Sequence, residues 1–210
     1  GEAPGEQEER TGRPFVGMAG QLLDQMLARV GLARGECYIT NVSQIRPPGN
    51  QFIPFFYSDK SGKTPNAVLL DQRERLQKEI RAVKPGVIVA MGNEALKALG
   101  MVSGIGNYRG TMIENFGLRV LPTYHPSFIQ RGNWEMKSVV ELDLKKAIRQ
   151  ARSPYHPFTD FQVDPSYEQV IRFLQERPKY LSCDIETTRD PVMTKCIGFA
   201  WSKHNAICIP

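Results

Sequence analysis

The segment GVIVAMG, residues 86–92, constrains the fold more than any other stretch of the sequence. An uninterrupted apolar run bounded by glycines is typical of a strand that is buried on both faces, as in parallel sheets. Further strands are predicted at residues 37–42 and 119–123, and amphipathic helices at residues 21–30, 68–83, 93–100 and 135–152. Strands that alternate with helices predict an α/β domain with a largely parallel sheet.

Three unusual loops are expected at the ends of strands: GEAPG (residues 1–5), NVSQIRPPGN (41–50) and YHPS (124–127). In parallel sheets, ligands bind at the loops that leave the carboxyl ends of the strands. The first loop belongs to a Gly- and Pro-rich stretch, residues 1–17, that we expect to be irregular and to follow a strand lying ahead of Gly1. The three loops together are therefore the predicted functional site.

Composition and charge indicate which partners and which cellular compartment the protein suits. The net charge of +5 and the pI near 9.1 suit a polyanionic partner without requiring one. No apolar run approaches the roughly 18 residues of a membrane span, so no membrane partner is expected. The four cysteines (Cys37, Cys183, Cys196 and Cys208) are scattered, which favours buried thiols in a reducing, cytoplasmic setting.

Residues 153–165 (SPYHPFTDFQVDP) are rich in proline and aromatic residues and show no periodicity. This change in composition predicts a linker between a domain at 1–152 and another at 166–210. A helix and three strands are expected in the second domain. Asp184 and Glu186 alternate on one of these strands, so both carboxylates face the same side. Paired carboxylates can begin a two-metal site, although a solvated strand edge explains an isolated pair equally well.

The motifs GEAPGEQEERTGRPFVG, YITN, RPPGN and TYHPS, in this order, resemble the uracil-DNA glycosylases, specifically the thermostable iron–sulfur type called family four. The resemblance covers about residues 1–150. It implies a three-layer α/β/α fold around a parallel sheet whose first strand is missing from this chain. It also implies hydrolysis of the bond between uracil and deoxyribose in DNA, with the nucleotide flipped out of the duplex.

The resemblance assigns a role to each matching residue. It implies catalytic roles for Glu2, Glu8 and His125, substrate binding by Phe15, Asn41, Asn50 and Ser127, and DNA intercalation by Ile129 with Arg131. A carboxylate can orient water and offset positive charge on the sugar, and a histidine can stabilise the departing uracil anion. An asparagine offers the donor and acceptor that match the edge of uracil, and an aromatic ring supplies a stacking surface.

Each residue alone has a simpler explanation: Phe15 as core, His125 as a turn cap, Asn41 as the end of a strand. Two function classes therefore stay open. The domain is either an active glycosylase or a non-catalytic module that senses uracil or binds DNA. The intact Glu2, Asn41 and His125 favour the enzyme.

The family's iron–sulfur cluster is expected to be absent. Its two middle cysteines are replaced by Ile45 and Gln72, and no cysteine lies between Cys37 and Cys183. The neighbouring residues 51–66 (QFIPFFYSDKSGKTPN), here called the aromatic insert, look too irregular for an element of their own. We expect the insert to replace the cluster by packing its rings into the gap: Phe52, Phe55, Phe56 and Tyr57.

The order of strands after residue 179 resembles the start of the DnaQ-like 3′-to-5′ exonuclease domain of family A DNA polymerases, which has a ribonuclease H-like fold. The resemblance implies that Asp184 and Glu186 bind Mg²⁺ once later motifs complete the domain. It also implies that the remainder of a phage-type polymerase chain follows on the C-terminal side.

Overall fold

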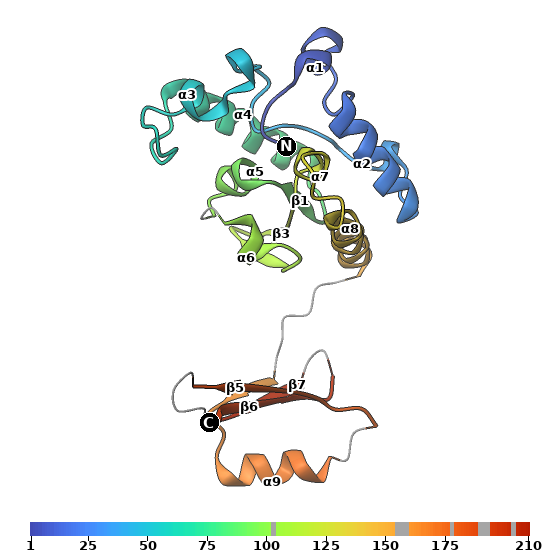
Figure 1. Ribbon diagram of the computed structural model, residues 1–210, viewed down its shortest axis with the longest axis vertical. Coiled ribbons are helices and arrows are strands. Elements are labelled where there is room, and N and C mark those ends of the chain that lie inside the picture. Colours follow the sequence, from blue (N-terminus) through green and yellow to red (C-terminus); the bar gives the residue numbers. More distant parts are fainter. Residues whose placement is uncertain (102–103, 154–159, 177–178, 189–193, 203–204) are drawn as a thin grey trace. The chain divides into compact units, whose positions relative to one another are not determined.

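The structure is a computed structural model that describes residues 1–101, 104–153, 160–176, 179–188, 194–202 and 205–210 (Figure 1). The chain forms two compact units, Gly1–Pro154 and Tyr155–Pro210. Among the described residues, no helix has both the length and the apolar character that crossing a membrane requires.

The first unit contains a three-stranded sheet in the order β1–β3–β2. Strands β1 (Ile88–Met91) and β3 (Leu118–Thr123) pair in parallel, and both lie where the apolar runs predict them. Strand β2 (Ile113–Asn115), which was not predicted, pairs antiparallel with β3. The turn between β2 and β3 places Phe116 and Gly117 at positive φ (48° and 74°), a conformation that Phe rarely adopts.

Strand β1 is covered on both faces, as its sequence predicts. Ile88 and Ala90 belong to one core cluster together with α4 (Ala67–Val83) and α5 (Asn93–Ala98). Val89 and Met91, which point to the opposite face, belong to a second cluster that also contains residues of α2 (Met18–Arg29) and α8 (Met136–Arg152). Helices therefore cover both sides of the sheet, which makes this unit a mixed α/β fold in layers (Figure 1).

The predicted strand at residues 37–42 is wrong as a strand of this sheet. The segment runs beside the N-terminus, where the amine of Gly1 donates to the Thr40 carbonyl (3.0 Å) and the Val42 N–H donates to the Gly1 carbonyl (2.9 Å). An apolar cavity of about 460 Å³ is lined by this segment on one side and by β1 on the other. A strand exists only beside a hydrogen-bonded neighbour, and this segment pairs with neither β1 nor any other described strand.

Two stretches predicted to be irregular contain short helices. Helix α1 (Glu6–Thr11) lies within residues 1–17; Gly5 is its N-cap, the Glu8 carboxylate accepts the Gly5 N–H, and Gly12 ends the helix at a φ of 67°. Helix α3 (Phe52–Phe56) lies within the aromatic insert. The remaining short helices are η1 (Arg34–Glu36), η2 (Pro48–Asn50), α6 (Ile105–Tyr108) and α7 (Pro126–Gln130).

The second unit is a four-stranded sheet in the order β4–β7–β6–β5. Its elements are β4 (Asp160–Val163), α9 (Tyr167–Gln175), β5 (Ser182–Thr187), β6 (Thr194–Ala200) and β7 (Asn205–Ile209). The sheet is antiparallel except for β4, which pairs in parallel with β7. Helix α9 packs through Phe173, whose ring lies 4.5 Å from that of Trp201.

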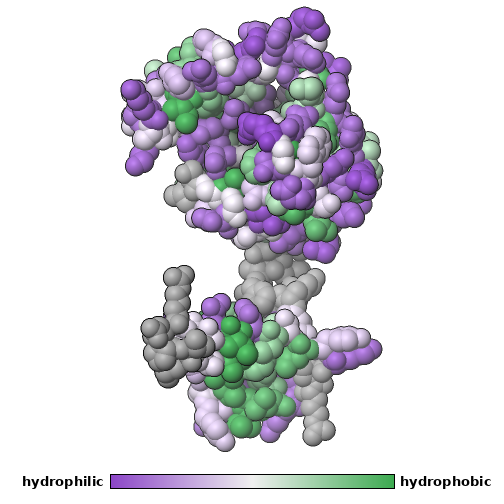
Figure 2. All heavy atoms as spheres, in the orientation of Figure 1, coloured by the Kyte–Doolittle hydropathy of each residue, from purple (hydrophilic) through white to green (hydrophobic). Residues whose placement is uncertain are grey.

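Strand β4 corrects the predicted linker at residues 153–165. Residues 154–159 lie outside the described part of the chain, but Asp160–Val163 is a sheet strand rather than linker. Figure 2 shows hydrophobic residues gathered on the visible face of this second unit, whereas hydrophilic residues cover most of the visible face of the first. Phe161, Val163 and Ile185 are among its exposed apolar residues.

Candidate active site

Six of the residues predicted to form the site line one pocket of about 180 Å³, here called the polar pocket: Glu2, Glu8, Phe15, Asn41, Asn50 and His125. They come from three separate segments of the chain. Residues 1–17 supply one wall, the segment around Asn41 and Asn50 supplies another, and the loop after β3 supplies His125. The structure therefore brings the three unusual loops together.

His125 is held as a neutral ring with one defined tautomer. It is the N-cap of α7, and its Nδ1 accepts the Ser127 backbone N–H at 3.1 Å. The Ser127 hydroxyl lies 2.8 Å from the same nitrogen. Because an atom that accepts an N–H carries no proton, the proton of the neutral ring is on Nε2.

Burial lowers the pKa of His125 to about 3, and the positive charge of Arg131 acts in the same direction. The ring is therefore neutral at physiological pH. It offers an N–H donor at Nε2 to any acceptor in the polar pocket.

Glu2 lies at the mouth of the polar pocket and keeps its side chain exposed. Partial desolvation raises its pKa, the carboxylate of Glu94 raises it further, and Arg131 opposes both. This carboxylate binds a proton more readily than an ordinary glutamate does, although it remains close to solvent.

Glu8 lines the pocket and also braces the loop through its carboxylate. Its carboxylate accepts backbone N–H groups from Gly5 (3.1 Å), Val16 (2.8 Å) and Gly17 (2.7 Å). Burial raises the pKa of Glu8, but these backbone hydrogen bonds outweigh burial and lower it overall. Both oxygens are thus engaged in fixing the segment that carries Phe15.

Phe15 is buried and has a left-handed backbone, with a φ of 53°. The guanidinium of Arg34 stabilises this backbone conformation by donating to the carbonyls of Pro14 (2.6 Å) and Phe15 (2.9 Å). A side-chain carbon at Gly20 would lie only 1.9 Å from the Phe15 carbonyl oxygen, so this position requires glycine. The ring of Phe15 lies 5.4 Å from that of His125. Sequence reasoning missed Arg34 and Gly20.

Asn41 is almost fully buried, with 6% of its surface exposed, and lines the same pocket. Its backbone carbonyl accepts from Arg75, whereas its side-chain amide has no hydrogen-bond partner among the described residues. Asn50 lies at the pocket's edge with a φ of 57°, and its side-chain oxygen accepts from Arg46 (3.0 Å). Asn41 therefore presents a donor and an acceptor to the pocket, while Asn50 already has one partner.

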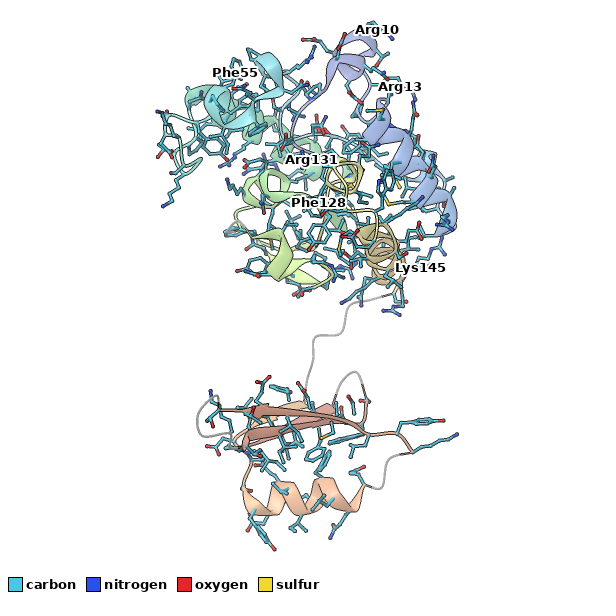
Figure 3. The ribbon with its side chains drawn as sticks, in the orientation of Figure 1. Arg10, Arg13, Phe55, Phe128, Arg131 and Lys145 are labelled. Atoms are coloured by element: carbon cyan, nitrogen blue, oxygen red, sulfur yellow. The ribbon has the colours of Figure 1, made fainter. Side chains whose placement is uncertain are left out.

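The prediction that Ile129 intercalates into DNA is wrong. Ile129 lies on α7 with none of its surface exposed and packs in the core cluster of α2 and α8. Its neighbour Phe128 is half-buried and stacks on Tyr124, with ring centroids 4.9 Å apart. Arg131 is exposed just after α7 (Figure 3), so its positive charge remains available to a ligand.

The arrangement suits recognition of a planar amide-containing base. A ring, an unengaged amide and an N–H donor converge on a small cavity with a carboxylate at its mouth. The sequence profile of the Uracil DNA glycosylase superfamily matches residues 1–146. The chain belongs to this superfamily.

Curated members of the uracil DNA glycosylase superfamily are similar to this chain over most of its length. The Type-4 uracil-DNA glycosylase of Thermotoga maritima is 39% identical over 151 residues, covering 70% of this chain and 73% of that protein. The Type-4 enzyme of Pyrobaculum aerophilum is 37% identical over 141 residues, covering 62% of this chain and 66% of that protein. That of Archaeoglobus fulgidus is 34% identical over 155 residues, covering 70% and 72%.

The residues present do not fit the iron–sulfur cluster that the family-four resemblance implies. Ile45 is an exposed aliphatic side chain, and Gln72 is a buried amide whose oxygen accepts the Gln44 N–H at 2.9 Å. Neither can supply a thiolate. Within the described ranges, no group of three or more His, Cys, Asp or Glu residues could hold a metal ion.

The aromatic insert is fixed by rings and by a buried ionic network. Phe52, Phe56 and Tyr57 are buried in the core cluster of α4 and β1. The Tyr57 hydroxyl donates to Glu94 of α5 at 2.6 Å, and Lys97 lies 2.8 Å from the other oxygen of that carboxylate. Burial, and then the bond to Glu94, raise the pKa of Tyr57, so its hydroxyl stays protonated.

Asp184 and Glu186 lie on β5 of the second unit, and both are exposed. Strand alternation puts them on the same face, as predicted. Within the part of this unit that the structure describes, no third His, Cys, Asp or Glu joins them in a group that could hold a metal.

Proposed function

We propose that the first unit hydrolyses the N-glycosidic bond of deoxyuridine in DNA and releases uracil. The observation that carries the proposal is the convergence of Asn41, Phe15 and a neutral His125 on one small pocket, with Glu2 at its mouth. The similarity to the Type-4 enzymes supports the same activity.

Asn41 and Phe15 recognise the base, and His125 assists cleavage of the bond. The Asn41 amide pairs with the edge of a flipped-out uracil, because it can donate to O4 and accept from N3–H, whereas cytosine offers the reverse pattern. Phe15 stacks against the base. Breaking the C1′–N1 bond leaves the bonding electrons on uracil, and the Nε2–H of His125 donates to the oxygen on which this negative charge collects.

Glu2 acts on the sugar side of the reaction. In its ionised form it offsets the positive charge that develops at C1′ and orients the water that adds there. Because the pKa of Glu2 is raised, this carboxyl group ionises at a higher pH than an ordinary glutamate does. DNA reaches the pocket past exposed cationic residues, and Arg10, Arg13 and Arg131 lie on the half of this unit that carries α1 and α7 (Figure 3).

The proposed reaction needs no metal or other cofactor. The buried aromatic insert and the bonds of Tyr57 and Lys97 to Glu94 support this part of the proposal, since they fix the insert without a cluster. Purified protein containing residues 1–210 should release uracil from single- and double-stranded oligonucleotides with one deoxyuridine, equally with and without EDTA. Binding of uracil-DNA without release of the base would instead favour the non-catalytic sensing module.

For the second unit we propose the beginning of a 3′-to-5′ exonuclease domain of a polymerase-type chain. The alternation of Asp184 and Glu186 on the exposed strand β5 supports it. The superfamily match ends at residue 146 and lends this unit no support. Digestion of single-stranded DNA that depends on Mg²⁺, tested in a chain extended beyond Pro210, decides the proposal.

A further inference from the structure

One face of α4 carries a row of polar side chains that contacts the segment holding Asn41. Gln72, Arg75 and Glu79 are spaced three and four residues apart, so they lie on the same face of the helix. All three make hydrogen bonds to residues 40–44. The polar pocket is therefore connected to a helix that does not itself line it.

Arg75 is the centre of this row. Its Nη2 donates to the backbone carbonyls of Asn41 (2.8 Å) and Val42 (2.9 Å). Its Nη1 donates to Glu79, which also accepts from the Thr40 hydroxyl at 3.0 Å. Only 20% of the Arg75 side chain is exposed. A planar guanidinium with these partners fixes both the position and the direction of the Asn41 backbone.

Residues 37–42 depend on the hydrogen bonds from Arg75 because they form no hydrogen-bonded pairing with β1. On that side the segment faces the apolar cavity of about 460 Å³ instead of a hydrogen-bonded strand. Its other backbone hydrogen bonds join Thr40 and Val42 to Gly1, and Cys37 to the carbonyl of Arg34. A shift of about 1 Å at a binding group is enough to weaken its hydrogen bonds to a substrate severely.

We propose that Arg75 is a positioning residue for the recognition of uracil. It holds the carbonyl of Asn41 so that the buried side-chain amide meets the base edge, although Arg75 itself does not touch the substrate. The inference rests on the proposed glycosylase function and adds a determinant of base specificity on α4.

The test compares Arg75→Met with Arg73→Met. Arg73 is a matched control because it lies on the same helix, has one buried, unpartnered Nε as Arg75 does, and donates to the Tyr57 hydroxyl (3.2 Å) rather than to the Asn41 segment. Three quantities are measured in wild type and both variants: single-turnover uracil release, inhibition by free uracil, and amide hydrogen exchange of residues 40–43.

Arg75→Met should slow uracil release roughly 10- to 100-fold, the range for a lost charged hydrogen bond, and weaken inhibition by free uracil by a similar factor. Exchange at residues 40–43 should accelerate. Arg75→Lys, which keeps the charge but not the planar fork, should give an intermediate loss. Arg73→Met should leave all three quantities near wild type.

Two results would overturn the inference. One is uracil release by Arg75→Met at the wild-type rate; the other is an equal loss in Arg73→Met, which would mean that the helix is merely destabilised. A wild-type protein that releases no uracil refutes the proposed glycosylase activity instead. The two failures are therefore distinguishable.

Discussion

Replacing His125 with glutamine should change how the stability of the protein depends on pH. In the folded protein the pKa of His125 is lowered from 6.5 to about 3, mainly by burial. The unfolded chain therefore binds a proton at this residue below about pH 6.5 while the folded protein does not. The proton stabilises the unfolded state, so wild type loses stability as the pH falls through this range, whereas His125→Gln has no such group.

The magnitude follows from the two pKa values. At pH 7.5 the histidine contributes almost nothing, and at pH 5 it lowers the free energy of unfolding by about 2 kcal/mol. Because the folded pKa lies well below 5, this value is set by the unfolded pKa and is insensitive to the depth of burial. The stability difference between His125→Gln and wild type should therefore shift by about 2 kcal/mol in favour of the variant between pH 7.5 and pH 5.

Urea unfolding of both proteins at the two pH values measures this difference. Titrations that the two proteins share, including that of Glu2, cancel in the comparison to first order. An unchanged stability difference would mean that His125 titrates as a solvent-exposed histidine does. The neutral donor assigned to uracil stabilisation would then be wrong.

Three further changes test the other parts of the site. Asn41→Asp should cost about 2–4 kcal/mol in transition-state stabilisation, measured as kcat/KM for uracil release, because aspartate cannot donate to O4; an unchanged rate removes Asn41 from the pocket. Gly20→Ala should lower stability by about 1–3 kcal/mol in urea unfolding and weaken inhibition by free uracil, since the added methyl group meets the Phe15 carbonyl; a neutral effect contradicts the tight contact. In a chain extended beyond Pro210, Asp184→Ala should abolish Mg²⁺-dependent digestion of single-stranded DNA and leave uracil release intact; joint loss of both activities argues against separate sites.

The central elements could be predicted from the sequence because their signals are local. The apolar run of β1 and the helical periodicities of α4 and α8 depend on residues within one element. The position of His125 at the pocket was also predictable, because its loop leaves the carboxyl end of β3, whereas residues 1–5 and 41–50 reach the pocket without a described strand before them.

The missed features depend on contacts between residues far apart in the sequence. Arg75 lies 34 residues from Asn41 and acts on a backbone carbonyl, which leaves no motif. Strand β4 exists only because β7 pairs with it. The burial of Ile129 is decided by the packing of a five-residue helix against two distant helices, and a helix that short carries too little periodicity to show which face is inward.

The bond from Tyr57 to Glu94 has a consequence for where such a protein can work. A loop fastened by a phenol and a carboxylate contains no inorganic part that oxygen can degrade or that iron starvation can withhold. In the proposed cofactor-free enzyme, assembly of this loop needs only the folding of the chain, without the machinery that delivers clusters to apo-proteins. Heterologous production should accordingly yield colourless protein whose specific activity is the same after aerobic and anaerobic purification.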